Sequence, residues 1–390
     1  MIKMKKSRLI LALVSVITAA VLVTAGGLYT YMQVRGMTLV PKDDYETLAD
    51  MGERYGKLYS LETTLEEKCI YDFDREAAMD AVYRIMADAV GDEYTAYFDE
   101  EELKAWTSYT EGTFTGVGVS FIEDDSGKIL ITSVLEEGPA DGAGIKKGDQ
   151  ILKVDGKKVS DAETAKKALR GEEGSTVELT YQRDGKTKTV KLVRGQVEEI
   201  SVYGGVLDEQ YGYIAISAFE KNTAEQFRTE LSRLENKALK GLIVDLRGNP
   251  GGLVEQSVEI ADMLLPEGTI TYTENKQGEK EYYNSDENYT KMKYVVLTDK
   301  NSASSSEILA AAVKDNKGGT LVGTTTYGKG VIQGLIEFND GTALRLTYMQ
   351  YFSPKGKKIQ GVGVEPDYLV EQTADAKTDK QLEKAIALLK

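Results

Sequence analysis

Four serines, Ser302, Ser304, Ser305 and Ser306, stand directly before a helix-forming run in the stretch "NSASSSEILAAAVKDN". A serine at the start of a helix can be a cap, and Ser304 to Glu307 match the S-x-x-E capping box. A serine there can also be a nucleophile. The cluster follows the short apolar run "KYVVLTD", and a catalytic serine is often exposed at such a strand-to-helix turn. The residues by themselves leave the choice among the four serines open.

A nucleophilic serine needs a base, and the sequence contains no histidine. A lysine becomes a base where burial disfavours its charged form. In "TYGKGVIQG", Lys329 lies between two glycines and follows the strand-like run "GTLVGTT". If residues 329–333 are extended, Lys329 and Gln333 point to the same face, so Gln333 can hydrogen-bond and orient the amine. The alternative is a solvated lysine in a turn.

The loop "RGNPGGLVEQ" supplies the third candidate part of a site. It follows the buried strand-like run "GLIVDL" and opens a helical segment, so its backbone N–H groups can bind a negative oxygen. A phosphate site is the rival interpretation, but the pattern G-x-x-x-x-G-K-[ST] is absent, which argues against a nucleotide. A simple tight turn remains the structural alternative.

The overall composition excludes several classes of function. The 390 residues include 48 Lys plus Arg and 63 Asp plus Glu, which gives a net charge of −15 and argues against nucleic acid as a partner. The single cysteine, Cys69, excludes an intrachain disulfide framework. Without histidine there is no His-based zinc site and no imidazole triad. The sequence is long enough for two or three domains.

Residues 1–36 have the pattern of a short cytoplasmic tail followed by a membrane anchor. Residues 9–34 form an uncharged run of 26 residues, enough to span a bilayer, and they follow the basic start "MIKMKKSR". Basic flanks tend to stay in the cytoplasm, so we expect most of the protein on the outer side of the membrane. A cleaved signal peptide is the alternative, because "VTA" before Gly26 offers small residues for cleavage.

The rest of the sequence changes character twice. Residues 37–112 have apolar residues at helical spacing, and we expect a helical support or dimerisation segment without a chemical role. Residues 113–195 predict a small β-rich module with one main helix and a hairpin turn at Asp184-Gly185. In residues 196–390 strands alternate with helices, which predicts an α/β layer.

Several motifs in the same order resemble the C-terminal processing peptidases, the tail-specific serine proteases. They are "VDLRGNPGG", "NSASSSEILAAAVKDN", "TTYGKGVIQ" and "YFSPKGKKIQGVGVEPD". "FTGVGVSF" and "GPADGAGIKKGDQILKVDG" resemble the PDZ domain of that family, and "GDEYTAYFD" is similar to the segment before it. The resemblance covers residues 40–390. It implies an α/β fold: a crotonase-like protease core, an inserted PDZ domain and an N-terminal helical segment with a candidate role in dimerisation.

Carried over by residue, the resemblance places the nucleophile on Ser304, the general base on Lys329 and the orienting third member on Gln333. The backbone amide of Ser305 and one from the Gly251-Gly252 turn then form the oxyanion hole. One departure is that Ser305 and Ser306 occupy a stretch where alanine and serine commonly alternate in the family.

In the PDZ-like module, the loop from Phe114 to Gly118 resembles a carboxylate-binding loop. The residues expected to bind the C-terminus of a peptide, with the peptide added as a strand, are Phe114, Gly116, Val117, Gly118 and Val119. Arg170, at the end of "AKKALRG", is a candidate for coupling the PDZ domain to the core. A solvated charge at the end of a helix is the alternative for Arg170.

The function that follows is a membrane-anchored, extracytoplasmic serine endopeptidase that needs no metal or organic cofactor. Its expected partners are protein substrates with apolar C-terminal tails, the membrane through the N-terminal helix, and a second copy of the protein. A catalytically inactive PDZ scaffold that binds protein C-termini is the non-enzyme alternative. A crotonase-type acyl-CoA enzyme is the enzymatic alternative, against which the PDZ domain and the anchor argue.

Overall fold

The computed structural model describes residues 5–124, 126–135, 137–373, 376 and 378–390. The first four residues, including Lys3 of the predicted cytoplasmic tail, lie outside them. The protein divides into two compact units, Met1–Ala81 and Val82–Lys390. Every residue predicted to take part in a site lies in the second unit.

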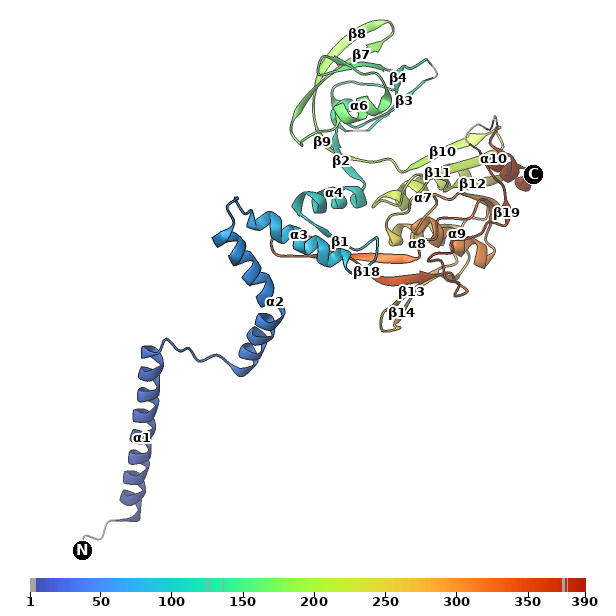
Figure 1. Ribbon diagram of the computed structural model, residues 1–390. Helices are drawn as coiled ribbons and strands as arrows, with labels where there is room; N and C mark the ends of the chain where they lie inside the picture. Colours follow the sequence, from blue (N-terminus) through green and yellow to red (C-terminus); the bar gives the residue numbers. More distant parts are fainter. Residues whose placement is uncertain (1–4, 125, 136, 374–375, 377) are drawn as a thin grey trace. The chain divides into compact units, whose positions relative to one another are not determined.

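The first unit contains two long helices, α1 (Lys6–Val34) and α2 (Lys42–Lys68), drawn in dark blue in Figure 1. The predicted uncharged run forms most of α1, which is long and apolar enough to cross a membrane. None of its side chains is buried, and nearly all of the apolar ones are exposed. Helix α2 follows Pro41 and has Asp43 and Asp44 in its first turn, where acidic side chains complement the helix dipole.

Helix α3 (Arg75–Asp88) leads from the first unit into the second. A short strand, β1 (Ala96–Phe98), and helix α4 (Glu100–Glu111) follow it. Helix α4 begins with a capping box between Asp99 and Glu102 and ends at Gly112, whose φ of 62° is left-handed. Segment 37–112 is therefore mainly helical, as predicted, but it also adds strand β1 to a sheet of the second unit.

A β-rich module follows, as the sequence predicts, and Figure 1 draws it in green with α6 among its strands. Its elements are β2 (Thr113–Gly116), β3 (Val119–Glu123), β4 (Ile129–Val134), α5 (Pro139–Gly142), β5 (Gln150–Val154), β6 (Lys157–Lys158), α6 (Ala162–Leu169), β7 (Thr176–Arg183), β8 (Lys186–Val193) and β9 (Gly195–Glu198). The predicted turn at Asp184 and Gly185 is confirmed, because both residues have positive φ and join β7 to β8 in register. Strands β2 and β9 pair with each other and form the two connections of the module.

The α/β layer contains a sheet in the order β10-β11-β12-β15-β16-β19. Its strands are β10 (Val202–Leu207), β11 (Tyr211–Ile216), β12 (Gly241–Asp245), β15 (Tyr294–Thr298), β16 (Thr320–Gly323) and β19 (Tyr368–Leu369). All pairs after the β10–β11 pair are parallel. Residues Tyr294–Thr298 of β15 are buried on both faces, which is typical of a parallel strand between helices.

Helices cover both faces of this sheet. On one face, Leu242 and Val244 pack in the core with α7 (Thr223–Glu235), α8 (Val254–Leu264) and α9 (Ser305–Asn316). On the other face, Ile243 packs with α10 (Lys380–Leu389). The alternation of neighbouring residues between two apolar cores explains why the run "GLIVDL" has no polar face.

A second, antiparallel sheet packs on α8 and α9 from the opposite side. It consists of β1 and of β13 (Gly268–Asn275), β14 (Lys280–Ser285), β17 (Val331–Glu337) and β18 (Ala343–Phe352). Strand β17 begins only at Val331, and its register against β18 shifts between Ile332 and Gln333. Gln333 therefore lies in a strand as expected, but Lys329 precedes that strand, and the extra residue of the bulge is Tyr348 on β18.

Candidate functional site

Ser304 lies at the turn between β15 and α9, as the N-cap residue of α9. Its φ of 55° and ψ of −116° are a rare conformation for a residue with a side chain. Such a strained backbone costs free energy and tends to occur where function requires it. The half-buried Ser304 side chain donates to no acceptor in the part of the protein that the structure describes.

The other three serines of the cluster are buried and hold the turn together. Ser302 Oγ donates to the Leu246 carbonyl at 2.8 Å, and Ser305 Oγ donates to the Gly252 carbonyl at 2.8 Å. Ser306 Oγ donates to the Asn249 carbonyl at 3.0 Å. These three bonds fasten the serine turn to the glycine loop. Only the fourth hydroxyl, that of Ser304, is left without an acceptor among the described residues.

Glu307 joins the serine turn to the segment that carries Lys329. Its carboxyl group is fully buried and accepts hydrogen bonds from four donors. They are the Ser304 amide at 2.9 Å, the Lys329 amide at 2.8 Å, the Gly328 amide at 2.7 Å and Thr326 Oγ1 at 2.5 Å. The Glu307 of the predicted capping box is thus also the acceptor that fixes the backbones of Ser304 and Lys329 to each other.

Tyr351 makes the same connection from the second sheet. Its side chain is buried, and its hydroxyl donates to the Ser304 carbonyl at 3.0 Å and to the Lys329 carbonyl. Burial, with the nearby Glu307 and Tyr94, raises the pKa of Tyr351 well above its usual value. Tyr351 therefore stays neutral and acts as a donor.

The amine of Lys329 is half-buried. Its Nζ lies 4.2 Å from the ring centroid of Tyr94 and makes no hydrogen bond or ion pair within the described residues. Burial lowers the pKa of Lys329, and the charge of Arg345 lowers it further, while Asp92, Glu93 and Glu307 act in the opposite direction. A lowered pKa increases the neutral fraction that a base needs.

Gln333 lies on β17 and donates through Nε2 to Thr347 Oγ1 at 3.0 Å. Within the described residues it does not hydrogen-bond Lys329, because its amide is paired with Thr347 instead. The structure thus connects the backbones of Ser304 and Lys329 through two shared hydrogen-bond partners, Glu307 and Tyr351. Gln333 lies apart from this network, two residues after the start of β17.

The glycine loop after β12 lies directly against Ser304. A Cβ on Gly251, whose φ is 101°, would come within 2.7 Å of the Ala303 carbonyl oxygen and of Ser304 Cβ. A Cβ on Gly252 would overlap the Phe219 carbonyl. The Gly251 amide donates to Asn249 Oδ1 at 2.8 Å, whereas the amides of Gly252 and Ser305 have no acceptor in the described residues. The close approach requires glycine at both positions.

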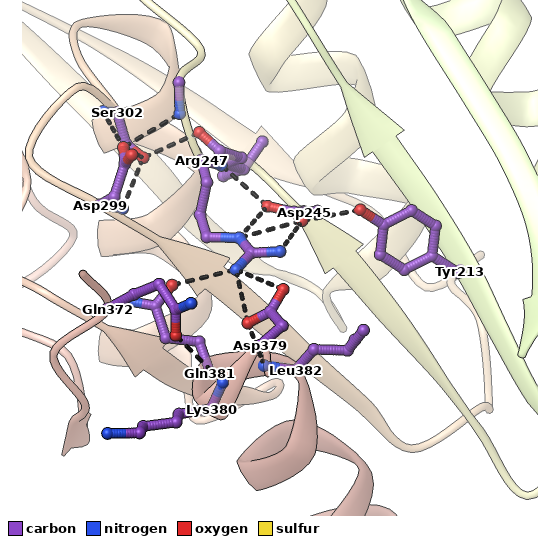
Figure 2. Close-up of polar contacts among 12 residues, drawn as sticks. Tyr213, Asp245, Arg247, Asp299, Ser302, Gln372, Asp379, Lys380, Gln381 and Leu382 are labelled. Atoms are coloured by element: carbon purple, nitrogen blue, oxygen red, sulfur yellow. Dashed lines mark hydrogen bonds and ion pairs between the residues drawn. The ribbon is translucent and has the colours of Figure 1, made fainter. Parts of the chain in front are cut away.

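Figure 2 shows how the start of this loop is fixed. Arg247 donates from Nη2 to Asp245 Oδ2 at 2.6 Å and from Nη1 to Asp379 Oδ1 at 3.0 Å. Tyr213 donates to the same Asp245 carboxyl group at 2.7 Å. Asp379 is the N-cap of α10, so the C-terminal helix is tied to the loop that faces Ser304.

In the β-rich module, one groove lies between β3 and α6. All five residues predicted to bind a peptide C-terminus line it: Phe114, Gly116, Val117, Gly118 and Val119. The opposite wall comes from α6, with Lys166 and Leu169, and from its C-cap residue Arg170. An open strand β3 beside a helix is the geometry in which a peptide can add as a further strand.

Arg170 lies where the module joins the core. Its guanidinium is 4.4 Å from the ring centroid of Phe114, and its Nη2 is 3.7 Å from Glu199 Oε2. Glu220 is buried nearby against Gly112. Burial, with the charge of Glu199, raises the pKa of Glu220 to about 7.

Sequence reasoning did not predict the roles of Tyr94, Glu307 and Tyr351 in this site. Glu307 was visible only as a helix cap, and its other three donors come from residues 326–329, which no local pattern connects to it. Tyr94 lies in "GDEYTAYFD", whose resemblance to a family segment was a signal of importance without a stated role.

Comparisons with known proteins agree with this arrangement. The model of peptidase family S41 matches residues 210–370, and that of the PDZ domain matches residues 115–193. The protein is 32% identical over 323 residues to the carboxy-terminal processing protease CtpA of Bacillus subtilis, covering 82% of this chain and 69% of that protein. It is 34% identical over 330 residues to a carboxyl-terminal-processing protease of Picosynechococcus, covering 81% of this chain and 80% of that protein.

Among solved structures, the fold is similar to that of the photosystem II D1 C-terminal processing protease. The TM-score is 0.51 and the sequence identity 29%, over 85% of this chain and 90% of that one.

Proposed function

The protein belongs to peptidase family S41, among the carboxy-terminal processing proteases, and we propose that it is a membrane-anchored, extracytoplasmic serine endopeptidase with Ser304 as nucleophile and Lys329 as base. One observation carries the assignment. Of the four clustered serines, Ser304 alone has a hydroxyl without an acceptor among the described residues, and Glu307 ties its backbone to that of Lys329.

In the proposed reaction, neutral Lys329 takes the hydroxyl proton of Ser304 as the oxygen attacks a peptide carbonyl. The tetrahedral intermediate collapses when the lysine returns that proton to the leaving amine, and an acyl-enzyme remains. Water, deprotonated by Lys329, then hydrolyses the ester. We assign Gln333 to orienting the amine. In the observed arrangement it pairs with Thr347, so this role requires its side chain to turn from Thr347 to Lys329.

We assign the oxyanion hole to the backbone amides of Ser305 and Gly252. Both amides lack an acceptor in the described residues, and Ser305 is the first residue of α9, where the helix dipole favours negative charge. The Gly251 amide already donates to Asn249, so we assign Gly251 the role of allowing the loop to approach Ser304.

The proposed substrate is a protein whose C-terminal tail binds in the groove between β3 and α6. The groove residues Val117, Val119, Phe121 and Leu169 are apolar, which favours an apolar tail. We assign the binding of the terminal carboxylate to the loop from Phe114 to Gly118, which lines this groove. Arg170 contacts both Phe114 and Glu199, and this supports a role in coupling tail binding to the core.

Helix α1 supports anchoring in the membrane, with the basic residues before it on the cytoplasmic side. A cleaved signal sequence would fit the same helix. For the core we propose a crotonase-like arrangement, supported by the parallel sheet with helices on both faces. Exposed apolar side chains along α2, among them Leu48, Met51 and Tyr55, support dimerisation through this segment.

The test is cleavage of an unfolded protein with an apolar C-terminus by the full-length protein in detergent. Ser304→Ala and Lys329→Ala are expected to lower kcat/KM by more than about a thousand-fold. Ser306→Ala is the matched control. It removes one structural hydrogen bond from the same turn and should keep activity within about tenfold of the wild type. Cleavage at the wild-type rate by either of the first two variants would contradict the dyad, and no cleavage by the wild-type protein would favour an inactive scaffold.

A further inference from the structure

The aromatic ring that faces Lys329 comes from outside the region matched by the peptidase family. Tyr94 lies between α3 and β1, in a segment for which the residue pattern indicates no chemical role. Its ring centroid is 4.2 Å from Lys329 Nζ, within the range of a cation–π interaction. Tyr94 therefore contacts the proposed base although it lies outside the motifs that carry Ser304 and Lys329.

Three interactions with β18 hold the backbone around Tyr94 in place. Arg345 Nε on β18 donates to the Tyr94 carbonyl at 2.7 Å, and the Thr347 amide donates to Thr95 Oγ1 at 3.2 Å. Strand β1 then pairs with β18 at residues 96–98. All three interactions use the backbone or neighbouring side chains, and the Tyr94 hydroxyl interacts with Glu93 and Tyr327, so the face of the ring is left to contact Lys329.

The tyrosine itself is a poor candidate for the base. Burial, with the neighbouring Glu93 and Tyr327, raises the pKa of the Tyr94 hydroxyl above its usual value, so the ring carries no charge at neutral pH. A neutral ring attracts a cation to its face and discriminates between the ammonium and the neutral amine.

We propose that Tyr94 is a positioning residue for Lys329, whose ring holds the amine at the site and stabilises the ammonium that forms when Ser304 gives up its proton. This inference rests on the proposed Ser304–Lys329 mechanism. It adds that the segment before the PDZ domain completes the active site.

Charged groups around the Lys329 amine also affect its pKa, independently of the Tyr94 ring. Arg345 on β18 opposes the ammonium, whereas Asp92 and Glu93 beside Tyr94 and Glu307 on α9 favour it. Tyr351, whose hydroxyl binds the Lys329 carbonyl, has a raised pKa and is neutral. None of these groups is removed by a change in the Tyr94 side chain, so the effect of the ring can be measured separately.

The test measures the rate at which a fluorophosphonate modifies the serine of the full-length protein in detergent, as a function of pH. Tyr94→Leu removes the ring and keeps the apolar volume, and Tyr94→Phe keeps the ring and removes only the hydroxyl. In Tyr94→Leu we expect the acidic limb of the profile to move to lower pH by about half to one unit. We also expect the plateau rate to fall about three- to tenfold, because the amine is a weaker base. In Tyr94→Phe the limb should coincide with that of the wild type.

A purely structural role would lower the rate at every pH and leave the limb in place, so an unmoved limb in Tyr94→Leu would overturn the proposal. A limb that moves equally in Tyr94→Phe would overturn it too, because the hydroxyl would then be responsible. Thermal unfolding of each variant establishes that it folds. Lys329→Ala separates the two hypotheses: undiminished labelling would contradict the dyad itself, whereas lost labelling with an unmoved Tyr94→Leu limb contradicts only the role of Tyr94.

Discussion

The serine turn and the junction of the PDZ domain with the core differ in the hydrogen bonding of their buried polar groups. In the serine turn, Glu307 has four donors and three serine hydroxyls each have a carbonyl acceptor. At the junction, Arg170 Nε and Glu220 Oε2 are buried without a hydrogen-bond partner among the described residues. A buried polar group without a partner is costly, whereas a satisfied network is rigid.

This difference suggests how the two regions work. The serine turn is held in one strained geometry by many bonds, which suits a nucleophile that must not move. The junction, with its close carboxyl groups Glu199 and Glu220 and its incompletely paired Arg170, lacks such a network, so we expect it to change its arrangement more easily than the serine turn. Two kinds of variant test this difference. One removes a hydrogen-bond acceptor, Glu307, from the serine turn, and the other removes the unpaired carboxylate of Glu220 at the junction.

Among changes outside the proposed dyad, the largest effect is expected from Glu307→Gln. Its amide nitrogen cannot accept the hydrogen bonds that one carboxyl oxygen accepts, so at least one bond to Ser304, Gly328 or Lys329 is lost. We expect kcat/KM to fall about a hundred-fold, measured on folded protein with the unfolded substrate, since misplacement by about 1 Å can cost that much.

The matched control is Asp315→Asn on the same helix. Asp315 is also buried and accepts from Ser353 Oγ at 2.5 Å, but it contacts neither Ser304 nor Lys329 in the part of the protein that the structure describes. It should lower thermal stability and leave kcat/KM of the folded protein nearly unchanged. Equal losses of activity in the two variants would show that Glu307 matters only for stability.

A smaller loss is expected from Gly251→Ala. The added methyl group would approach Ser304 Cβ and the Ala303 carbonyl to 2.7 Å, so either the loop or the serine turn must move. We expect kcat to fall about ten- to fifty-fold. Gly248→Ala is the control in the same loop, because its φ of 73° is also left-handed but its new Cβ meets no atom within 4 Å. If both variants lose activity equally, backbone strain and not the close approach is the cause.

The smallest effect, on stability alone, is expected from Glu220→Gln at the junction. Burial raises the pKa of Glu220 to about 7 in the folded protein, above its unfolded value near 4.5. The folded state then binds more protons than the unfolded state between these values, so wild-type stability should fall as pH rises from about 4.5 to 7. Glu220→Gln lacks this decline and should be more stable than the wild type at pH 8, by on the order of 1 kcal/mol. Parallel stability curves from pH 4 to 8 would contradict the buried charge.

The sequence predicted the features that depend on local pattern. The runs that became β12, β15, α8 and α9 are apolar or periodic over their own length, and Asp184-Gly185 specifies its hairpin without distant help. The serine cluster was recognisable for the same reason, although only the hydrogen bonds of its neighbours distinguish Ser304 physically from the other three.

What the sequence could not predict depends on pairing between distant segments. The pairing of Gln333 with Thr347 is set by the register of β17 against β18, including the bulge at Tyr348, which no residue of "KGVIQ" encodes by itself. Tyr94 reaches Lys329 only because β18 binds the segment before β1, which lies far earlier in the sequence. Contacts of this kind come from the tertiary fold, so a one-dimensional pattern does not contain them.

The most direct test of the central claim is to find which serine reacts and whether Lys329 activates it. The full-length protein is treated with a fluorophosphonate, and the modified peptide is identified by mass spectrometry in the wild type and in Lys329→Ala. The account predicts modification of Ser304 alone in the wild type and none in Lys329→Ala at the same pH and time. Modification of Ser302, Ser305 or Ser306, or equal modification of Ser304 without Lys329, would contradict it.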